Sequence, residues 1–318
     1  MNILSVPAPP PVPSSAPVMP GSAAAWAMAL RPRSMAIAVS PVLVAVALVW
    51  SRGETVDLLL ALLALAAAVM MQVITNLQND VGYTARGAER LRNRMGLPRA
   101  TALGVLTPAQ VRSAILLAIA MAVALGLPLV AARGWPVLAM GLASIVAALA
   151  YMGGPRPIAW TPLGEPTVFV FFGLVAVVGT DFVLSGRADS AVTWLAAAAL
   201  GGLAAAALVV NNARDIEHDR SVGRRTLPSL LGRRRTELLF GLTLAGPFVL
   251  LPLMAVPGGA LPLLLPLLLL PSALRLWRDF VHCAPGLPFN GLLFRTFLME
   301  LKFAALLAAG ALLARLLG

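Results

Sequence analysis

Long apolar runs recur along most of the 318-residue chain and alternate with short polar connectors. A helix needs roughly 17–25 apolar residues to cross the ~30 Å hydrocarbon layer of a bilayer. The runs predict about nine such helices, at about 35–50, 56–75, 111–131, 135–151, 166–183, 191–210, 238–256, 261–276 and 296–313. Solid Ala/Leu/Val runs indicate helices, because a membrane β-barrel shows a weak alternation instead. The pattern therefore predicts an all-α, polytopic membrane protein.

The first segment has a different composition. Residues 1–23 are rich in Pro, Ser and Ala and carry no charge, which predicts a disordered tail. The segment lacks the basic start and compact apolar core of a signal peptide, so we expect no cleavage. We expect residues 24–318 to form one transmembrane domain.

Composition agrees with a membrane protein. Hydrophobic residues make up 59% of the chain and charged residues 12%, and the mean hydropathy is +0.89, which excludes a soluble domain. The net charge of +11 comes from arginines in the connectors, so it indicates membrane orientation and not nucleic-acid binding. Cys283 is the single cysteine, which excludes an internal disulfide. His218 and His282 are the two histidines, and neither belongs to a Cys/His cluster with the spacing of a zinc or iron–sulfur site.

Two of the expected spans end in polar residues. Asn211, Asp215 and Asp219 follow one another at i, i+4 and i+8, which would place them on one helical face. Asn76 and Asp80 repeat the i, i+4 spacing at the end of the second span. The two spans are an even number apart, so both ends open on the same side. Most connector arginines lie on that side, which predicts that both motifs face the cytoplasm.

These residue types suit one chemistry. Mg²⁺ takes one or two carboxylates together with phosphate oxygens, and guanidinium groups match phosphate bidentately. Asp80, Asp215 and Asp219 would hold the metal, and a cavity between apolar helices would hold a lipid tail. The pattern therefore predicts a Mg²⁺-dependent site for a lipid diphosphate, whose departure leaves an allylic cation for an aromatic acceptor.

Six segments carry a resemblance to a known family. They are LRPRS (30–34), ITNLQND (74–80), MGLPRATALGVLTP (95–108), YMGGPRPIAWTPLGE (151–165), NNARDIEHDRSVGRRTL (211–227) and GLPFNGLLFRT (286–296). In this order they resemble the UbiA superfamily of intramembrane aromatic prenyltransferases. Within it the chain looks most like the 1,4-dihydroxy-2-naphthoate polyprenyltransferases of menaquinone synthesis.

The resemblance implies a nine-helix bundle around a central cavity in the bacterial cytoplasmic membrane, surrounded by membrane lipid. It implies Mg²⁺-dependent transfer of a polyprenyl group from polyprenyl diphosphate to 1,4-dihydroxy-2-naphthoate with loss of CO₂, giving demethylmenaquinone. The residues that carry over as catalytic and metal-binding are Asp80, Asp215 and Asp219. Those that carry over as diphosphate- or prenyl-binding are Asn76, Asn79, Asn211, Arg156, Arg214, Arg220 and Arg224.

The chain departs from the family pattern in the first motif. Tyr83 stands where the family places another Asp, and Glu89 stands where a further Asp is common. A phenol with a pKa of ~10 is a poor Mg²⁺ ligand at neutral pH. One alternative is therefore a prenyltransferase of the same family that uses a different aromatic acceptor. A second alternative is a membrane transporter or lipid carrier, for which buried charges and internal repeats are also expected. The sequence indicates neither the prenyl chain length nor the oligomeric state.

Overall fold

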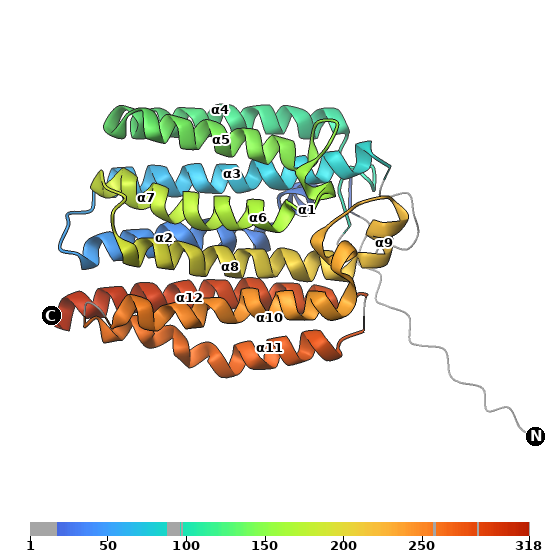
Figure 1. Ribbon diagram of the computed structural model, residues 1–318. Helices are drawn as coiled ribbons and strands as arrows, with labels where there is room; N and C mark the ends of the chain where they lie inside the picture. The colour runs from blue at the N-terminus through green and yellow to red at the C-terminus, as the bar shows by residue number, and fades with distance from the viewer. Residues whose placement is uncertain (1–17, 88–95, 97, 257–258, 285, 318) are drawn as a thin grey trace, which may run out of the picture.

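The structure, a computed structural model, describes residues 18–87, 96, 98–256, 259–284 and 286–317. Within these residues the chain forms a bundle of long, roughly parallel and antiparallel helices (Figure 1). The expected tail lies largely outside the described residues. Its last part is described, and there the Gly21 N–H donates to the carbonyl of Val105, 2.9 Å away.

The long helices match the predicted spans. They are α2 (Ala36–Ser51), α3 (Leu58–Ala85), α4 (Pro108–Arg133), α5 (Trp135–Met152), α6 (Gly164–Val168) continued by the π-helical η3 (Phe169–Val175) and α7 (Ala176–Ser185), α8 (Ala191–Arg214), α10 (Leu227–Ala255), the 3₁₀ helix η4 (Leu261–Leu269) continued by α11 (Leu270–His282), and α12 (Phe289–Leu317). Four shorter helices are α1 (Ala23–Leu30), η1 (Pro32–Ser34), η2 (Ile158–Trp160) and α9 (Ile216–Ser221).

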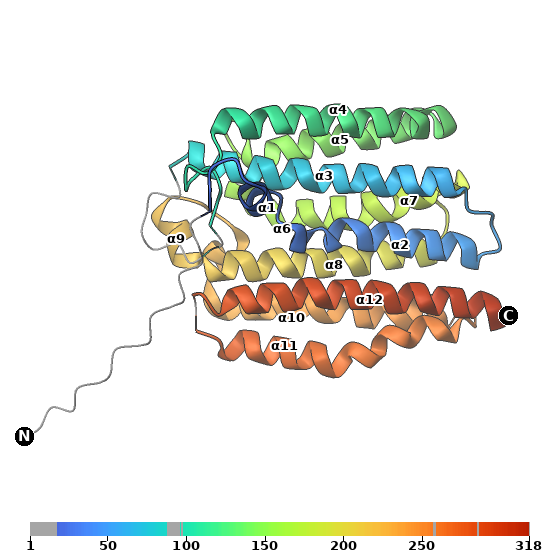
Figure 2. The same cartoon turned by 180° about the vertical axis from the view of Figure 1, so that it is seen from behind.

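Eight helices of the described chain are long and apolar enough to cross a membrane, or nine when the bent pair Ala23–Ser34 and Ala36–Ser51 counts as one span. The prediction of an all-α, integral membrane protein with about nine spans is confirmed. The ends of α3 and α8 lie at the same end of the bundle, beside α9 (Figure 1), and α1 lies next to α3 there (Figure 2).

The two polar helix ends differ in shape. Helix α3 continues unbroken to Ala85, so Asn76 and Asp80 share a helical face as expected. The expectation of one helix through Asn211, Asp215 and Asp219 is wrong. Helix α8 ends at Arg214, and Asp215 has φ −105° and ψ 14° outside the helical range. The carboxylate of Asp215 accepts two hydrogen bonds from the adjacent Arg214, which fixes the chain at this break.

Helix α8 lies at the centre of the bundle. Small residues let its backbone approach the neighbouring helices closely. A Cβ added to Gly173 of η3 would lie 2.6 Å from the Cα of Gly201, so only glycine fits at this crossing. Residues 199–207 of α8 are all buried, and they form part of the core against which the other helices pack.

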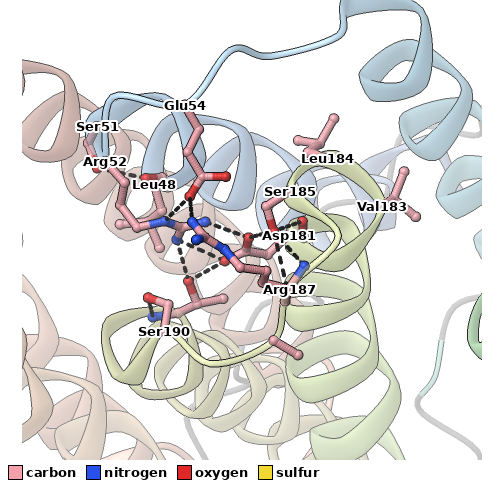
Figure 3. Close-up of polar contacts among 12 residues, drawn as sticks. Leu48, Ser51, Arg52, Glu54, Asp181, Val183, Leu184, Ser185, Arg187 and Ser190 are labelled. Carbon is pink, nitrogen blue, oxygen red and sulfur yellow. Dashed lines mark hydrogen bonds and ion pairs between the residues drawn. The ribbon is translucent and has the colours of Figure 1, made fainter. Parts of the chain in front are cut away.

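An ion-pair network closes the end of the bundle opposite to the polar motifs (Figure 3). Arg52 donates from both terminal nitrogens to the carboxylate of Asp181, at 2.9 and 2.6 Å, and from Nε to Glu54 at 3.0 Å. Arg187 donates to the same Glu54 oxygen, and Thr193 donates to Asp181. The network ties the connector after α2 to the end of α7 and the start of α8.

Candidate functional site

A cavity of about 460 Å³ runs between the helices from the end that carries the two motifs. Its walls are mostly apolar side chains of α3, α4, α5, α7 and α8. Its polar end is formed by Arg31, Arg33, Ser34, Gln72, Thr75, Asn76, Asn79, Tyr151 and Asn211. The cavity therefore combines a polar, cationic end with a long apolar body, the shape expected for a lipid with an anionic head group.

The polar end is built around Asn76. Its amide nitrogen donates to the carbonyl of Leu30 at 2.7 Å and to the hydroxyl of Ser34 at 3.0 Å. Its amide oxygen accepts a hydrogen bond from Gln72 at 3.1 Å. Asn76 thus holds the turn between α1 and η1 against α3. The main effect of its amide on the site is to position this turn.

The fastened turn presents Arg31 to the cavity. Arg31 has φ 52°, in the left-handed region, where a non-glycine residue is uncommon. Two of its guanidinium nitrogens, Nε and Nη2, are buried without a hydrogen-bond partner in the part of the chain that the structure describes, and so is Oδ1 of Asn79. An unsatisfied buried polar group costs about 1–3 kcal/mol. Unpartnered donors on a cation at the cavity wall point to an anionic ligand.

Asp80 is wholly buried and bonds to the loop that leads into α4. It accepts hydrogen bonds from the backbone N–H groups of Ala100 and Thr101, both at 2.9 Å, and from the Thr101 hydroxyl at 2.6 Å. The carboxylate therefore fixes this loop against the end of α3. A carboxylate offers about four acceptor positions, so these three bonds leave room for a further partner.

The second motif forms two buried ion pairs. Arg214 contacts Asp215 at 2.9 and 2.6 Å and also donates to Asn290 and Asn211. Arg224 contacts Asp219 at 3.0 Å and donates to the carbonyl of Ala159 at 2.7 Å.

The pKa of Asp219 reflects its surroundings. Burial raises this pKa to about 6, the Arg224 guanidinium opposes the rise, and the neighbouring Asp215 carboxylate adds to it. The effect of Asp215 also indicates that the two carboxylates belong to one electrostatic site.

Tyr83 lies between the two motifs. The guanidinium carbon of Arg99 is 3.7 Å from the centre of its ring, and that of Arg224 is 5.3 Å away. Burial lowers the pKa of Arg99 to about 10, a loss that Tyr83 and Asp80 partly offset, so Arg99 stays protonated at neutral pH. The tyrosine ring therefore joins α3, the loop before α4 and the second motif through cation–π contacts.

The described residues predicted for the site lie at one end of the bundle, but they differ in their relation to the cavity. Those that line it are Asn76, Asn79 and Asn211. Those that are buried without lining it are Asp80, Asp215, Asp219, Arg214 and Arg224. Arg156 is exposed in the connector after α5, and Arg220 is exposed and contacts Glu217 and the carbonyl of Ser229. Neither lines the cavity. Glu89 lies outside the described residues.

The sequence reasoning gave no site role to Arg31, Gln72 or Arg99. Arg31 belongs to the LRPRS motif, which could have indicated a role in the site. The left-handed backbone of Arg31 and its position at the cavity, however, accompany contacts of the turn with α3 that the motif does not reveal.

The donor chemistry of the site fits a magnesium ion. Its candidate ligands are carboxylate and amide oxygens, which Mg²⁺ prefers. Within the described residues, no three acidic, histidine or cysteine side chains lie close enough to hold a metal by themselves. Mg²⁺ usually binds through one or two carboxylates plus substrate phosphates, so the site suits a metal that arrives with a diphosphate. The assignment of Asp80, Asp215 and Asp219 as ligands stays a prediction.

Comparison with known proteins gives one consistent result. The UbiA prenyltransferase family matches residues 38–285. The 1,4-dihydroxy-2-naphthoate octaprenyltransferase of Escherichia coli K12 is 35% identical over 235 residues, which cover 72% of this chain and 75% of that protein. The protein of the same name from Mycobacterium tuberculosis is 34% identical over 248 residues, covering 74% of this chain and 80% of its own length.

Solved structures show the same fold at lower identity. A UbiA homolog from Archaeoglobus fulgidus, solved bound to GPP and Mg²⁺, superimposes with a TM-score of 0.62 at 16% identity, covering 91% of this chain and 99% of that chain. The apo structure of a UbiA homolog from Aeropyrum pernix K1 gives 0.64 at 20% identity, covering 87% and 97%. These matches confirm the predicted bundle.

Proposed function

Because the chain belongs to the UbiA prenyltransferase family, we propose that it transfers a polyprenyl group from polyprenyl diphosphate to 1,4-dihydroxy-2-naphthoate, with release of CO₂. The observation that carries the proposal is the cavity. Its cationic end presents two Arg31 nitrogens that have no hydrogen-bond partner among the described residues, and its body is apolar. A prenyl diphosphate has the matching distribution of charge. The names of the E. coli and M. tuberculosis relatives support the choice of the naphthoate.

In the proposed reaction the bond between the first prenyl carbon and the diphosphate oxygen breaks, and the oxygen keeps the electron pair. The allylic cation is attacked by the ring carbon that bears the carboxylate. The bond from that carbon to the carboxylate then breaks, CO₂ leaves, and its electron pair restores the aromatic ring. Bond changes and charges balance without a further reactant.

The side chains at the polar end have separate tasks in this scheme. Arg31 donates to the diphosphate and stabilises the charge that grows on the leaving oxygen. Asn211 lines the cavity beside it, held by Arg214 at 3.0 Å. The buried pairs of Asp215 and Asp219 keep the second motif in place. A bound Mg²⁺, held by these aspartates and Asp80, would neutralise the diphosphate and make it a better leaving group.

The apolar body of the cavity would hold the prenyl tail and exclude water from the allylic cation. The connectors at the polar end carry most of the arginines, which supports a cytoplasmic orientation in a bacterial inner membrane. A transporter fits less well, because the acidic groups of the two motifs lie at the ends of α3 and α8 and not near the middle of the bundle.

The test uses the purified protein in nanodiscs with octaprenyl diphosphate and 1,4-dihydroxy-2-naphthoate, with and without Mg²⁺. Prenylated product, detected by mass, together with Mg²⁺-dependent CO₂ release supports the proposal. Product with 4-hydroxybenzoate but none with the naphthoate would assign a different acceptor. No product with either acceptor would refute a role in aromatic prenyl transfer.

A further inference from the structure

The start of α6 brings a buried acid next to the second motif. Glu165 is the second residue of α6, and 4% of its surface is exposed. Helix α6 lies beside α8, at the end of the bundle that carries α9 (Figure 1). The carboxylate therefore lies inside the protein, near the residues of the second motif, and it does not line the cavity.

Four buried side chains form a continuous series of hydrogen bonds from α6 to the second motif. Oε1 of Glu165 accepts a hydrogen bond from Nδ2 of Asn212 at 2.8 Å. Oδ1 of Asn212 accepts a hydrogen bond from Nη2 of Arg224 at 3.2 Å. Nη1 of Arg224 donates to both carboxylate oxygens of Asp219, at 3.0 and 3.2 Å. None of the four residues is more than 4% exposed, so water competes little for these bonds.

The two neighbours of Asn212 determine the orientation of its amide. A guanidinium group has only donors, and a carboxylate has only acceptors. Turning the amide by 180° would set Nδ2 against the donors of Arg224 and Oδ1 against the carboxylate of Glu165. Glu165 therefore keeps the amide oxygen of Asn212 directed toward Arg224.

Arg224 is held at two points besides its ion pair. Its Nε donates to the carbonyl of Ala159 at 2.7 Å, and its Nη2 donates to Asn212. Because the guanidinium group is planar and rigid, these two bonds fix its plane. The plane determines where Nη1 meets the two oxygens of Asp219. The bond to Asn212 thus helps to set the direction of the Asp219 carboxylate.

Glu165 is a costly residue at this position. Its second oxygen, Oε2, is buried without a hydrogen-bond partner in the part of the chain that the structure describes. A buried acceptor without a partner destabilises the folded protein. Ionisable side chains inside a membrane bundle are costly and usually mark functional sites. The cost therefore favours a role of Glu165 in function over a role in packing.

We propose that Glu165 is a positioning residue for the site that binds metal and diphosphate. Through Asn212 it fixes the guanidinium of Arg224, and the guanidinium sets the direction of the Asp219 carboxylate. The inference rests on the proposed function, in which Asp219 is one of the residues that hold Mg²⁺. It adds two residues, Glu165 and Asn212, that act on the site without lining the cavity.

The experiment measures the binding of geranyl S-thiolodiphosphate, an unreactive analogue of a prenyl diphosphate, to the protein in nanodiscs. The quantity compared is the Mg²⁺ concentration that gives half-maximal binding. Glu165→Leu removes the acceptor that orients Asn212, and we expect this concentration to rise by about tenfold or more, the usual effect of removing a residue that positions a metal ligand. Glu165→Gln keeps an oxygen that can accept from Asn212, so it should retain most of the affinity.

Two further variants separate this role from a general effect on the bundle. Asn212→Leu keeps the size of the side chain and breaks both of its bonds, so it should act like Glu165→Leu, and the double variant should be no weaker than either single variant. Asn212→Leu also tests the inference by itself if Glu165→Leu does not fold. The matched control is Glu300→Leu, the same exchange at another buried carboxyl group, which should leave the Mg²⁺ concentration unchanged.

Three outcomes would overturn the inference. The first is wild-type Mg²⁺ dependence in Glu165→Leu and Asn212→Leu. The second is a loss in Glu165→Gln as large as that in Glu165→Leu, because the charge of Glu165 and not the orientation of Asn212 would then matter. The third is an equal loss in Glu300→Leu. A wild-type protein that does not bind the analogue with Mg²⁺ would refute the proposed function itself, whereas a wild type that binds it while the variants match refutes only the role of Glu165.

Discussion

Replacing Tyr83 tests whether the aromatic ring has a structural task at the position where the resemblance to the family leads us to expect an aspartate. The ring lies 3.7 Å from the Arg99 guanidinium and 5.3 Å from that of Arg224, and it is buried. A desolvated cation–π contact contributes about 2 kcal/mol, and a longer one about 1 kcal/mol. The Tyr83→Ala substitution should therefore lower the free energy of unfolding by on the order of 3 kcal/mol through the loss of these two contacts alone. Tyr83→Phe keeps the ring and should lose much less.

The effect on function follows from the position of the two arginines. Arg224 pairs with Asp219, and Arg99 donates to the carbonyl of Asn79 at 2.8 Å, so a displaced guanidinium disturbs both motifs. We expect Tyr83→Asp to reduce kcat/KM strongly even though it restores the family's carboxylate, because aspartate is too short to fill the space between the arginines. Tyr83→Phe should keep most of the activity.

The assay combines kcat/KM for each variant with a double-mutant cycle on the free energy of unfolding in mixed micelles. Tyr83→Ala and Arg99→Ala should show a coupling energy of about 2 kcal/mol, since each removes the same contact. Tyr83→Asp with activity equal to or above that of the wild type would refute the reasoning. It would mean that the missing carboxylate limits metal binding.

Three further changes have definite expected results. Asp215→Asn should abolish turnover by breaking the pair with Arg214, whereas Asp189→Asn, in an exposed connector at the opposite end, should leave turnover intact; full activity in both would contradict the role of the second motif. Arg31→Ala should raise KM for the prenyl diphosphate by about tenfold or more, and an unchanged KM would remove Arg31 from the diphosphate site. Glu300 is wholly buried, and neither carboxyl oxygen has a hydrogen-bond partner among the described residues. Glu300→Met should therefore raise the free energy of unfolding by about 1–3 kcal/mol, and a lower melting temperature would contradict this.

Local patterns in the sequence were enough to predict the spans and the two motifs. Span prediction depends only on the length and polarity of consecutive residues, because a bilayer imposes the same requirement on every helix. The family followed from short motifs in a fixed order, and the matches to the UbiA family confirm it. The i, i+4 spacing of Asn76 and Asp80 placed them on one face correctly, since helix α3 is continuous there.

The contacts between distant segments required the tertiary structure. Asp80 bonds to Ala100 and Thr101, and nothing in the spacing of the first motif indicates that partner. Helix α8 ends just before Asp215, whose backbone N–H donates to the carbonyl of Asn212 and whose carboxylate pairs with Arg214, and periodicity does not encode this break.

The same holds for Arg31 and for the wall of the cavity. Arg31 adopts its left-handed backbone beside a turn that Asn76 fastens from another helix, and the wall of the cavity combines side chains of α3, α4, α5, α7 and α8. Sequence by itself determined which segments enter the membrane and which residues can bind a metal diphosphate, because those properties belong to single segments. Tertiary structure decided which side chains are already partnered and where the cavity opens, because those properties arise only when segments far apart in the chain meet.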